Sequence, residues 1–195
     1  MGGPHASMAA DDTLNHIREL DIVVRGEGEE TIVDLCRALE KKGEPDGIAH
    51  VAGISYRRNG RVVHTSARPP ISDLDTLPFP AFHLVPFEKY NFTIEVPGHG
   101  PLPAINIMTS RGCPFNCSFC SVILLFGRKY RSCSVDRIME EIRVNGARAN
   151  HIFFCDDNFT AHPKRTRSLL ELMLKRKIGH WTCQVRCDVA KDEEL

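Results

Sequence analysis

The stretch TSRGCPFNCSFC, residues 109–120, places three cysteines at CxxxCxxC spacing directly after an apolar run. Cys113, Cys117 and Cys120 can come together without a long loop closure, and the glycine and proline beside the first of them favour a turn there. Thiolates are soft ligands that suit iron–sulfur clusters or zinc. Because only three ligands are local, a four-iron cluster here would keep one iron open. The spacing therefore predicts a metal site that can bind a reactant directly.

Composition limits the class of protein. The chain has 195 residues, of which 42% are hydrophobic and 26% charged, enough for one good core or two small ones. Its formal net charge is zero, which does not indicate a surface for nucleic acid. No apolar stretch approaches the roughly 20 residues of a membrane span, and the first residues lack a signal-peptide pattern. Eight cysteines without an export signal favour free thiols and metal binding. We therefore expect a cytoplasmic protein without nucleic-acid or membrane partners.

Residues 1–45 are predicted to be the end of an α/β unit. Asp11 or Asp12 can cap a short helix that runs to Leu20. The apolar run at residues 21–25 predicts one buried strand, which has too few neighbours in this segment to cover it. A second helix follows the strand. Its apolar face, which is predicted to lie in the core, consists of Ile32, Leu35, Cys36 and Leu39.

Residues 46–103 are predicted to form a hairpin and a proline-rich linker. Two β-prone runs, 48–56 and 62–65, flank Asn59-Gly60, a strong signal for a tight turn. Three arginines, at positions 57, 58 and 61, are expected at its solvated tip. From residue 67 the density of prolines is expected to prevent regular helix or strand. Apolar residues among the prolines indicate that this linker packs against the fold.

From residue 104 strands alternate with amphipathic helices. Strands are predicted at 104–109, 151–155 and 181–187, with helices after Ser134 and from Pro163 to Lys177. This order predicts a parallel sheet with right-handed crossovers. Ligands of such sheets lie beyond the carboxyl ends of the strands. The cysteine loop and the pair Asp156-Asp157 both fall at such ends, which supports an active site there.

The remaining cysteines are not predicted to be ligands. Cys133 and Cys155 have no partner at ligand spacing. Cys183 and Cys187 share a strand face with Trp181 that is expected to pack against helices. Arg186 lies on the opposite face, towards the interior of the sheet.

A site with three cysteines and a fourth ligand elsewhere could also hold zinc, although zinc sites prefer paired CxxC knuckles.

The cysteine stretch resembles the cluster motif of the radical S-adenosylmethionine (radical SAM) enzymes. The resemblance implies that Cys113, Cys117 and Cys120 hold a [4Fe-4S] cluster. It also implies that the amino and carboxylate groups of SAM chelate the open iron. The aromatic residue before the last cysteine is typical of these enzymes, and here it is Phe119. The residues that the resemblance places beside SAM are Phe119 through its backbone, Asp156, Asp157 and Arg186.

The beginning of the chain resembles the cobalamin-binding domain that precedes many radical SAM barrels. Residues 2–5 resemble its glycine-rich turn, and residues 21–30 resemble its closing strand and GEGE loop. The implied cobalamin contacts are Gly2, Gly3, His5, Gly26 and Glu27. The implied fold class is α/β. It combines the C-terminal half of a Rossmann-like cobalamin-binding domain in 1–45 with the first βα units of a partial (β/α)6 TIM-like barrel in 104–195.

The resemblance implies a cobalamin-dependent type of radical SAM enzyme. Such enzymes cleave SAM reductively to form a 5′-deoxyadenosyl radical, and they methylate, cyclise or otherwise modify C–H bonds of a small-molecule substrate. An electron donor such as flavodoxin or ferredoxin is implied. Two alternatives remain open: a methylthiotransferase-like radical SAM enzyme acting on RNA, and a non-catalytic zinc-binding module. Because the predicted barrel has only three strands, we expect the 195 residues to be an internal fragment.

Overall fold

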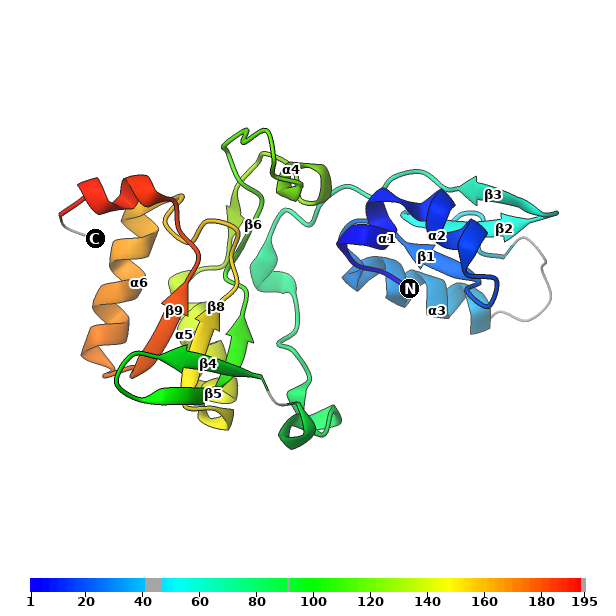
Figure 1. Ribbon diagram of the computed structural model, residues 1–195. Helices are drawn as coiled ribbons and strands as arrows, with labels where there is room; N and C mark the ends of the chain where they lie inside the picture. The colour runs from blue at the N-terminus through cyan, green and yellow to red at the C-terminus, as the bar shows by residue number, and fades with distance from the viewer. Residues whose placement is uncertain (41–46, 91, 194–195) are drawn as a thin grey trace. The chain divides into compact units, whose positions relative to one another are not determined.

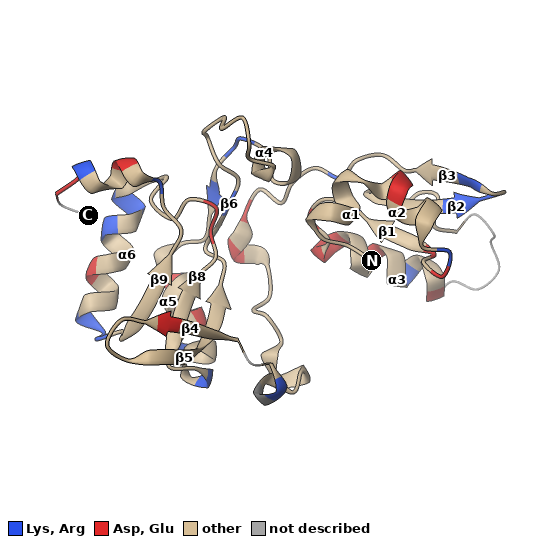
Figure 2. Ribbon diagram, in the orientation of Figure 1, with Lys and Arg blue, Asp and Glu red and all other residues tan. Residues whose placement is uncertain are grey.

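The structure is a computed structural model that describes residues 1–40, 47–90 and 92–193, within two compact units (Figure 1). The first unit comprises Met1–Ser72 and Cys117–Gly127, and the second comprises Asp73–Asn116 and Arg128–Leu195. The boundary predicted between residues 45 and 46 falls at the edge of a segment outside the described residues. Basic and acidic residues are interspersed along the chain of each unit (Figure 2). In the described part of the chain, no helix has the length and apolar character needed to cross a bilayer.

The first unit is built on a three-stranded antiparallel sheet in the order β1-β2-β3. The hairpin β2–β3 turns at Asn59-Gly60, where both residues have the positive φ that this turn requires. Strand β1 pairs with β2, so the expectation that β1 lacks neighbours is wrong: the hairpin supplies one. The elements of this unit are α1 (Pro4–Met8), α2 (Ala10–His16), β1 (Ile22–Val24), α3 (Glu29–Glu40), β2 (Ile54–Arg58), β3 (Arg61–His64) and α4 (Val122–Leu125).

Helices cover both faces of this sheet. Val23 packs with the α1–α2 side, while Val24, on the opposite face, packs with α3. The face of α3 that is buried differs from the predicted one by one position along the helix: it consists of Thr31, Leu35 and Ala38. Cys36 is exposed, which corrects its placement in the core, and Ile32 and Leu39 are also largely exposed. The apolar residues of α3 lie around a wider part of the helix than the face that packs on the sheet. Their spacing alone therefore could not identify which of them are buried.

Arg57 corrects the expectation of a solvated hairpin tip. Its guanidinium donates to the carbonyl oxygens of Ile17, Arg18 and Leu20 at 3.3, 2.6 and 2.5 Å, and also to that of Leu14. These carbonyls belong to the end of α2 and the turn after it, which have no helical partners of their own. The predicted helix to Leu20 therefore ends at His16, and Arg57 satisfies the carbonyls that follow. Asp11 lies in the first turn of α2 and does not cap it.

The second unit contains a four-stranded sheet in the order β4-β5-β8-β9. Strands β5, β8 and β9 are parallel, as predicted, while β4 is antiparallel to β5. Ser134 caps α5, since its hydroxyl accepts from the backbone N–H of Arg137 at 3.2 Å. The elements are η1 (Leu74–Thr76), η2 (Phe82–Leu84), η3 (Phe87–Lys89), β4 (Thr93–Val96), β5 (Gly100–Ile107), β6 (Ser110–Arg111), β7 (Arg131–Ser132), α5 (Val135–Asn145), η4 (Gly146–Arg148), β8 (His151–Phe154), α6 (Pro163–Lys175), β9 (His180–Cys183) and η5 (Cys187–Lys191).

The hairpin β4–β5 corrects the expectation that prolines exclude strand up to residue 103. The Ala104 N–H donates to the carbonyl of Phe92, on the β4 side of the strand, at 3.0 Å. Because alternate backbone nitrogens face opposite sides of a strand, those of Pro101 and Pro103 face away from β4, towards the β8 side. On that side β8 begins opposite Ala104, at His151. The missing N–H groups therefore remove no ladder hydrogen bond.

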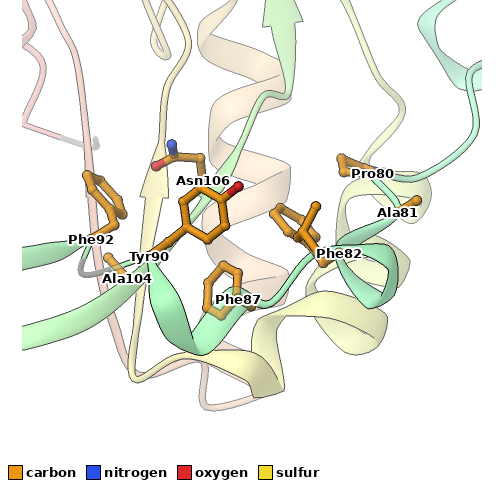
Figure 3. A pocket seen from close by; sticks show the side chains of 9 residues that line it. Pro80, Ala81, Phe82, Phe87, Tyr90, Phe92, Ala104 and Asn106 are labelled. Atoms are coloured by element: carbon orange, nitrogen blue, oxygen red, sulfur yellow. The ribbon is translucent and has the colours of Figure 1, made fainter.

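The two faces of β5 differ. Ile105 and Ile107 are buried on the face shared with the helices, whereas Asn106 and Met108 are exposed on the other face. The linker packs near this second face, as predicted, with Phe82, Phe87 and Tyr90 around Asn106 (Figure 3). The second unit is thus a mixed α/β fold with one helix-covered face and one open face.

Candidate functional site

The cysteine loop leaves the carboxyl end of β5 and is closed at its base. Strand β6, Ser110–Arg111, pairs with β7, Arg131–Ser132, and Cys133 donates its N–H to the carbonyl of Thr109 at 2.9 Å. Gly112 enters the loop with φ 82°, a conformation that favours glycine. The loop over residues 112–130 therefore begins and ends at one short two-stranded ribbon.

The three predicted ligands are half-exposed cysteines inside this loop, and none of them forms a disulfide. Cys117 and Cys120 share a tight turn, in which the Cys120 N–H donates to the Cys117 carbonyl at 3.1 Å. Cys113 belongs to the second compact unit, and the other two belong to the first. Among the residues that the structure describes, three Cys, His, Asp or Glu side chains do not converge in metal-binding geometry. Three cysteine thiols within one tethered loop are nevertheless the soft donors that could hold three of the irons of a four-iron cluster.

Asp156 lies behind the start of the loop. Its side chain is fully buried after β8. One carboxylate oxygen accepts from the Thr109 N–H at 2.9 Å and from the Ser110 hydroxyl at 2.6 Å, and the other accepts from the Thr109 hydroxyl at 2.8 Å. These bonds use the carboxylate inside the fold, so Asp156 is placed to position the loop and not to contact a ligand. This differs from the SAM contact expected for it.

Arg165, from the first turn of α6, joins the same buried group. It donates to the Thr109 carbonyl at 3.0 Å and to the Tyr130 hydroxyl at 3.4 Å, and it also bonds the Thr109 hydroxyl. Burial raises the pKa of Asp156, while the Ser110 and Thr109 donors and the Arg165 charge act in the opposite direction. Burial also raises the pKa of Tyr130, again opposed by Arg165. Sequence reasoning missed Arg165, because its partners Tyr130 and Thr109 lie 35 and 56 residues away along the chain.

Asp157 and Arg186 are the more accessible of the predicted SAM contacts. Asp157 is half-buried, and burial, followed by the charge of Asp156, raises its pKa. Arg186 lies just beyond β9, which ends at Cys183 and not at Cys187 as predicted. Its guanidinium stacks 3.9 Å from the Phe115 ring centroid and pairs with Asp188 at 3.2 Å. A pocket of about 250 Å³ lies between Phe115, Arg186 and the residues after β8.

Comparison with known proteins identifies this arrangement. The family model described as "Radical SAM superfamily" matches residues 107–195. Residues 107–195 are therefore a radical SAM region. An uncharacterized methyltransferase of Pyrococcus horikoshii is 42% identical over 85% of the chain and 34% of its own length. An anaerobic magnesium-protoporphyrin IX monomethyl ester cyclase of Rubrivivax gelatinosus is 34% identical over the whole chain and 35% of its own length. The chain thus spans about a third of the length of these curated relatives.

Solved structures share the fold. The cobalamin-dependent S-adenosylmethionine radical enzyme OxsB, with aqua-cobalamin and S-adenosylmethionine bound, aligns with a TM-score of 0.72. It is 24% identical over the whole chain and 26% of its own length. The radical S-adenosylmethionine methyltransferase TsrM from Kitasatospora setae aligns with a TM-score of 0.67 and 18% identity, over 90% of the chain and 33% of its own length. This radical SAM region therefore has the fold of enzymes that carry both cofactors.

The other cysteines of the radical SAM region are poor candidates for metal ligands. Burial raises the thiol pKa of Cys155 and of Cys183 to about 11, and it raises that of Cys133 as well. A thiol with such a pKa stays protonated at neutral pH, and metals bind the thiolate. Cys187 is exposed, which corrects the expectation that it packs against the helices.

Two glycines predicted to contact cobalamin lie together at the end of β1. Gly3 and Gly26 have φ values of 98° and 71°, and a side chain at either would meet open space. The Gly26 N–H donates to the Ser7 hydroxyl at 3.0 Å, which joins this turn to α1. Gly2 lies against β1, where its Cβ would be 3.5 Å from the Val24 carbonyl. His5 is exposed on α1.

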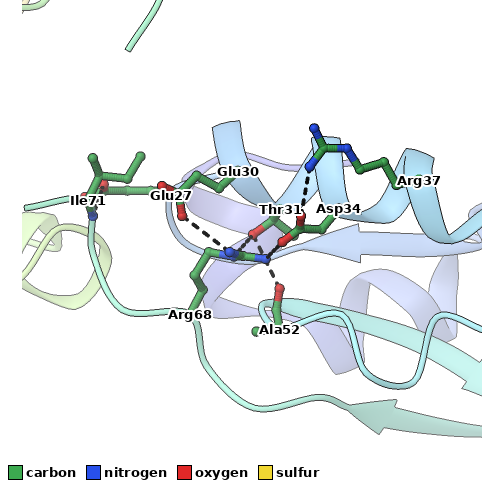
Figure 4. Close-up of polar contacts among 8 residues, drawn as sticks. All are labelled: Glu27, Glu30, Thr31, Asp34, Arg37, Ala52, Arg68 and Ile71. Atoms are coloured by element: carbon green, nitrogen blue, oxygen red, sulfur yellow. Dashed lines mark hydrogen bonds and ion pairs between the residues drawn. The ribbon is translucent and has the colours of Figure 1, made fainter. Parts of the chain in front are cut away.

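Glu27 does not share this open position. Its buried carboxylate accepts the Ile71 N–H at 2.9 Å. Nearby, Arg68 donates to the Thr31 hydroxyl at 2.8 Å and pairs with Glu30 at 3.3 Å and with Asp34 (Figure 4). The acidic residues of the GEGE loop and α3 therefore fasten the segment after the hairpin. This internal role differs from the cobalamin contact expected for Glu27.

Proposed function

We propose that this chain supplies the cluster-binding and SAM-binding part of a radical SAM enzyme that methylates or cyclises a small molecule. One observation carries the proposal: three cysteines that form no disulfide belong to the loop that follows the carboxyl end of β5, and Asp157 and Arg186 follow the next two parallel strands of the same sheet. Relatives named as methyltransferases and cyclases support this reaction class. The chain spans about a third of the length of these relatives, so the activity of the whole protein is part of this proposal.

In this proposal Cys113, Cys117 and Cys120 hold the [4Fe-4S] cluster. When bound, the cluster supplies a low-potential electron for the cleavage of SAM. The protein holds the base of the loop rigid through the β6–β7 ribbon and through Asp156, which binds Thr109 from behind. A fixed base reduces the entropy lost when three flexible thiols take one geometry.

The SAM contacts are assigned by charge. Asp157 suits the ammonium group or a ribose hydroxyl, because a half-buried carboxylate binds a cation or donor well. Arg186 suits the carboxylate, although its present partner is Asp188. The backbone of Phe119 is the third proposed contact, and its side chain is 90% exposed in the loop. Asp156 acts through the loop and does not touch SAM.

The first unit is proposed to contact cobalamin through Gly2, Gly3 and His5 at the start of the chain and through Gly26 after β1. The solved structure of OxsB with aqua-cobalamin, which has the same fold, supports this assignment. On the same basis we infer that the first unit is the end of a Rossmann-like domain and that the second begins a partial (β/α)6 barrel. A cytoplasmic location and an electron donor such as flavodoxin or ferredoxin complete the proposal.

The test uses chain that is purified and reconstituted without oxygen. SAM is added to the dithionite-reduced protein, and the EPR spectrum and the formation of 5′-deoxyadenosine are measured. The proposal predicts a cluster spectrum that changes on addition of SAM. Stoichiometric zinc with no iron would instead support the zinc-binding module. A cluster whose spectrum is unchanged under saturating SAM would refute the SAM site.

A further inference from the structure

An apolar pocket of about 410 Å³ lies on the open face of the second unit. Its walls are four aromatic rings from the linker and the start of β4, and its floor is β5 (Figure 3). The residues that define it are Phe82, Phe87, Tyr90, Phe92, Ala104 and Asn106. Its volume lies within the range of pockets that bind small molecules.

The pocket lies directly upstream of the cysteine loop. Ala104 and Asn106 are on the face of β5 opposite the helices, and Met108 continues that face towards the loop. Asn106 precedes Thr109 by three residues, which is about 10 Å in an extended strand. A molecule bound over Asn106 would therefore reach the base of the loop within its own length.

The lining chemistry selects the ligand. Phe82 and Phe87 meet edge to face at 5.6 Å, so the wall offers both ring faces and ring edges. Among the described residues that line the pocket none is charged, so these residues offer a charged ligand no counter-charge for its lost hydration. Two polar groups are present, the Tyr90 hydroxyl and the Asn106 amide, and both residues are exposed. The site therefore fits a neutral ring system with one or two hydrogen-bonding substituents.

We propose that this pocket binds the apolar ring portion of the substrate. The naming of the occupant as substrate rests on the function proposed above, whereas the ligand class rests on the pocket alone. Tyr90 and Asn106 are specificity-determining residues in this account, because among the described lining residues their side chains offer hydrogen bonds to an otherwise apolar ligand. Tyr90 is 61% exposed and lies at the rim, so it can close over a bound ring.

The test is a fluorescence titration of the full chain with N-phenyl-1-naphthylamine, a neutral aromatic molecule with one N–H group. We expect saturable binding that Tyr90→Ala weakens about five- to tenfold, the effect of losing one aromatic contact. Ala104→Leu, which fills the floor, should weaken it more. Leu84→Ala is the matched control, because Leu84 is exposed in the same linker, at the end of η2, and is not among the residues that line the pocket. Circular dichroism checks that each variant is folded.

Equal affinity in all variants, or equal weakening by Leu84→Ala and Tyr90→Ala, would overturn the pocket as a binding site. The reconstituted chain separates this result from the proposed function. Tyr90→Ala should retain the brown chromophore and the EPR response to SAM, since it touches neither. Pocket-dependent binding in a chain that forms no cluster would overturn the occupant's assignment as substrate. A cluster and SAM response without pocket-dependent binding would overturn this inference alone.

Discussion

Asp156→Ala should unfold the base of the cysteine loop. The change removes three hydrogen bonds, which Thr109 and Ser110 donate to the buried carboxylate, and it leaves the Arg165 charge without its counter-charge. Each buried donor left unpaired costs about 1–3 kcal/mol. Breaking a buried charge pair from one side costs about 3–5 kcal/mol. Because these costs overlap and the chain relaxes, we expect about 3–5 kcal/mol of lost stability.

Urea unfolding followed by far-UV circular dichroism measures this loss. Asp157→Ala is the matched control, since Asp157 is the same residue type one position later and is only half-buried. We expect it to cost less than about 1 kcal/mol. Asp156→Asn should fall between the two, because its amide keeps one acceptor oxygen. If Asp156→Ala and Asp157→Ala are equally stable, Asp156 does not hold the loop and the reasoning is wrong.

Three further predictions concern other parts of the fold. Folding raises the pKa of the Cys155 and Cys183 thiols from 9.0 to about 11, so their contribution to stability should be constant below pH 9 and should be lost as the pH rises towards 11. The double variant Cys155→Ser, Cys183→Ser should therefore show a shallower loss of stability between pH 9 and 11 in chemical unfolding. Arg57→Ala should lower the free energy of unfolding in urea by about 2–3 kcal/mol, because it removes the donor to the carbonyls at the end of α2 and after it. Arg61→Ala at the exposed tip should leave that free energy almost unchanged, and equal losses would contradict the bonding seen for Arg57. Asp157→Asn should raise the SAM concentration that gives the half-maximal EPR change about tenfold, because it removes a charge-assisted hydrogen bond to SAM. The iron content should be unchanged, and an unaltered SAM concentration at the midpoint would show that Asp157 is not part of the SAM site.

Short sequence patterns predicted the turns, the helix cap and the parallel strands that position the site. The cysteine spacing, the Ser134 cap and the Asn59-Gly60 turn each depend on residues within a few positions of one another. The alternation of strands and helices predicted that β5, β8 and β9 are parallel. It thereby placed the cysteine loop, Asp157 and Arg186 at one edge of the sheet.

Long-range pairing was not predictable. Asp156 and Thr109 are 47 residues apart, and Arg165 is 56 residues from Thr109. A sequence shows that such residues are polar but not that they face one another inside the fold. The hairpin's pairing with β1 and the burial of Glu27 depend on tertiary contacts in the same way. The prolines of β5 misled for a related reason, because their effect depends on which side of the strand is paired.

The cluster ligands are the central claim, and iron and sulfide analysis of anaerobically reconstituted variants tests it most directly. The chain should bind about four iron and four sulfide. Cys113→Ala, Cys117→Ala and Cys120→Ala should each abolish this content and the brown chromophore, whereas Cys133→Ala should retain both. Loss of the cluster in Cys133→Ala together with its retention in Cys120→Ala would contradict the account.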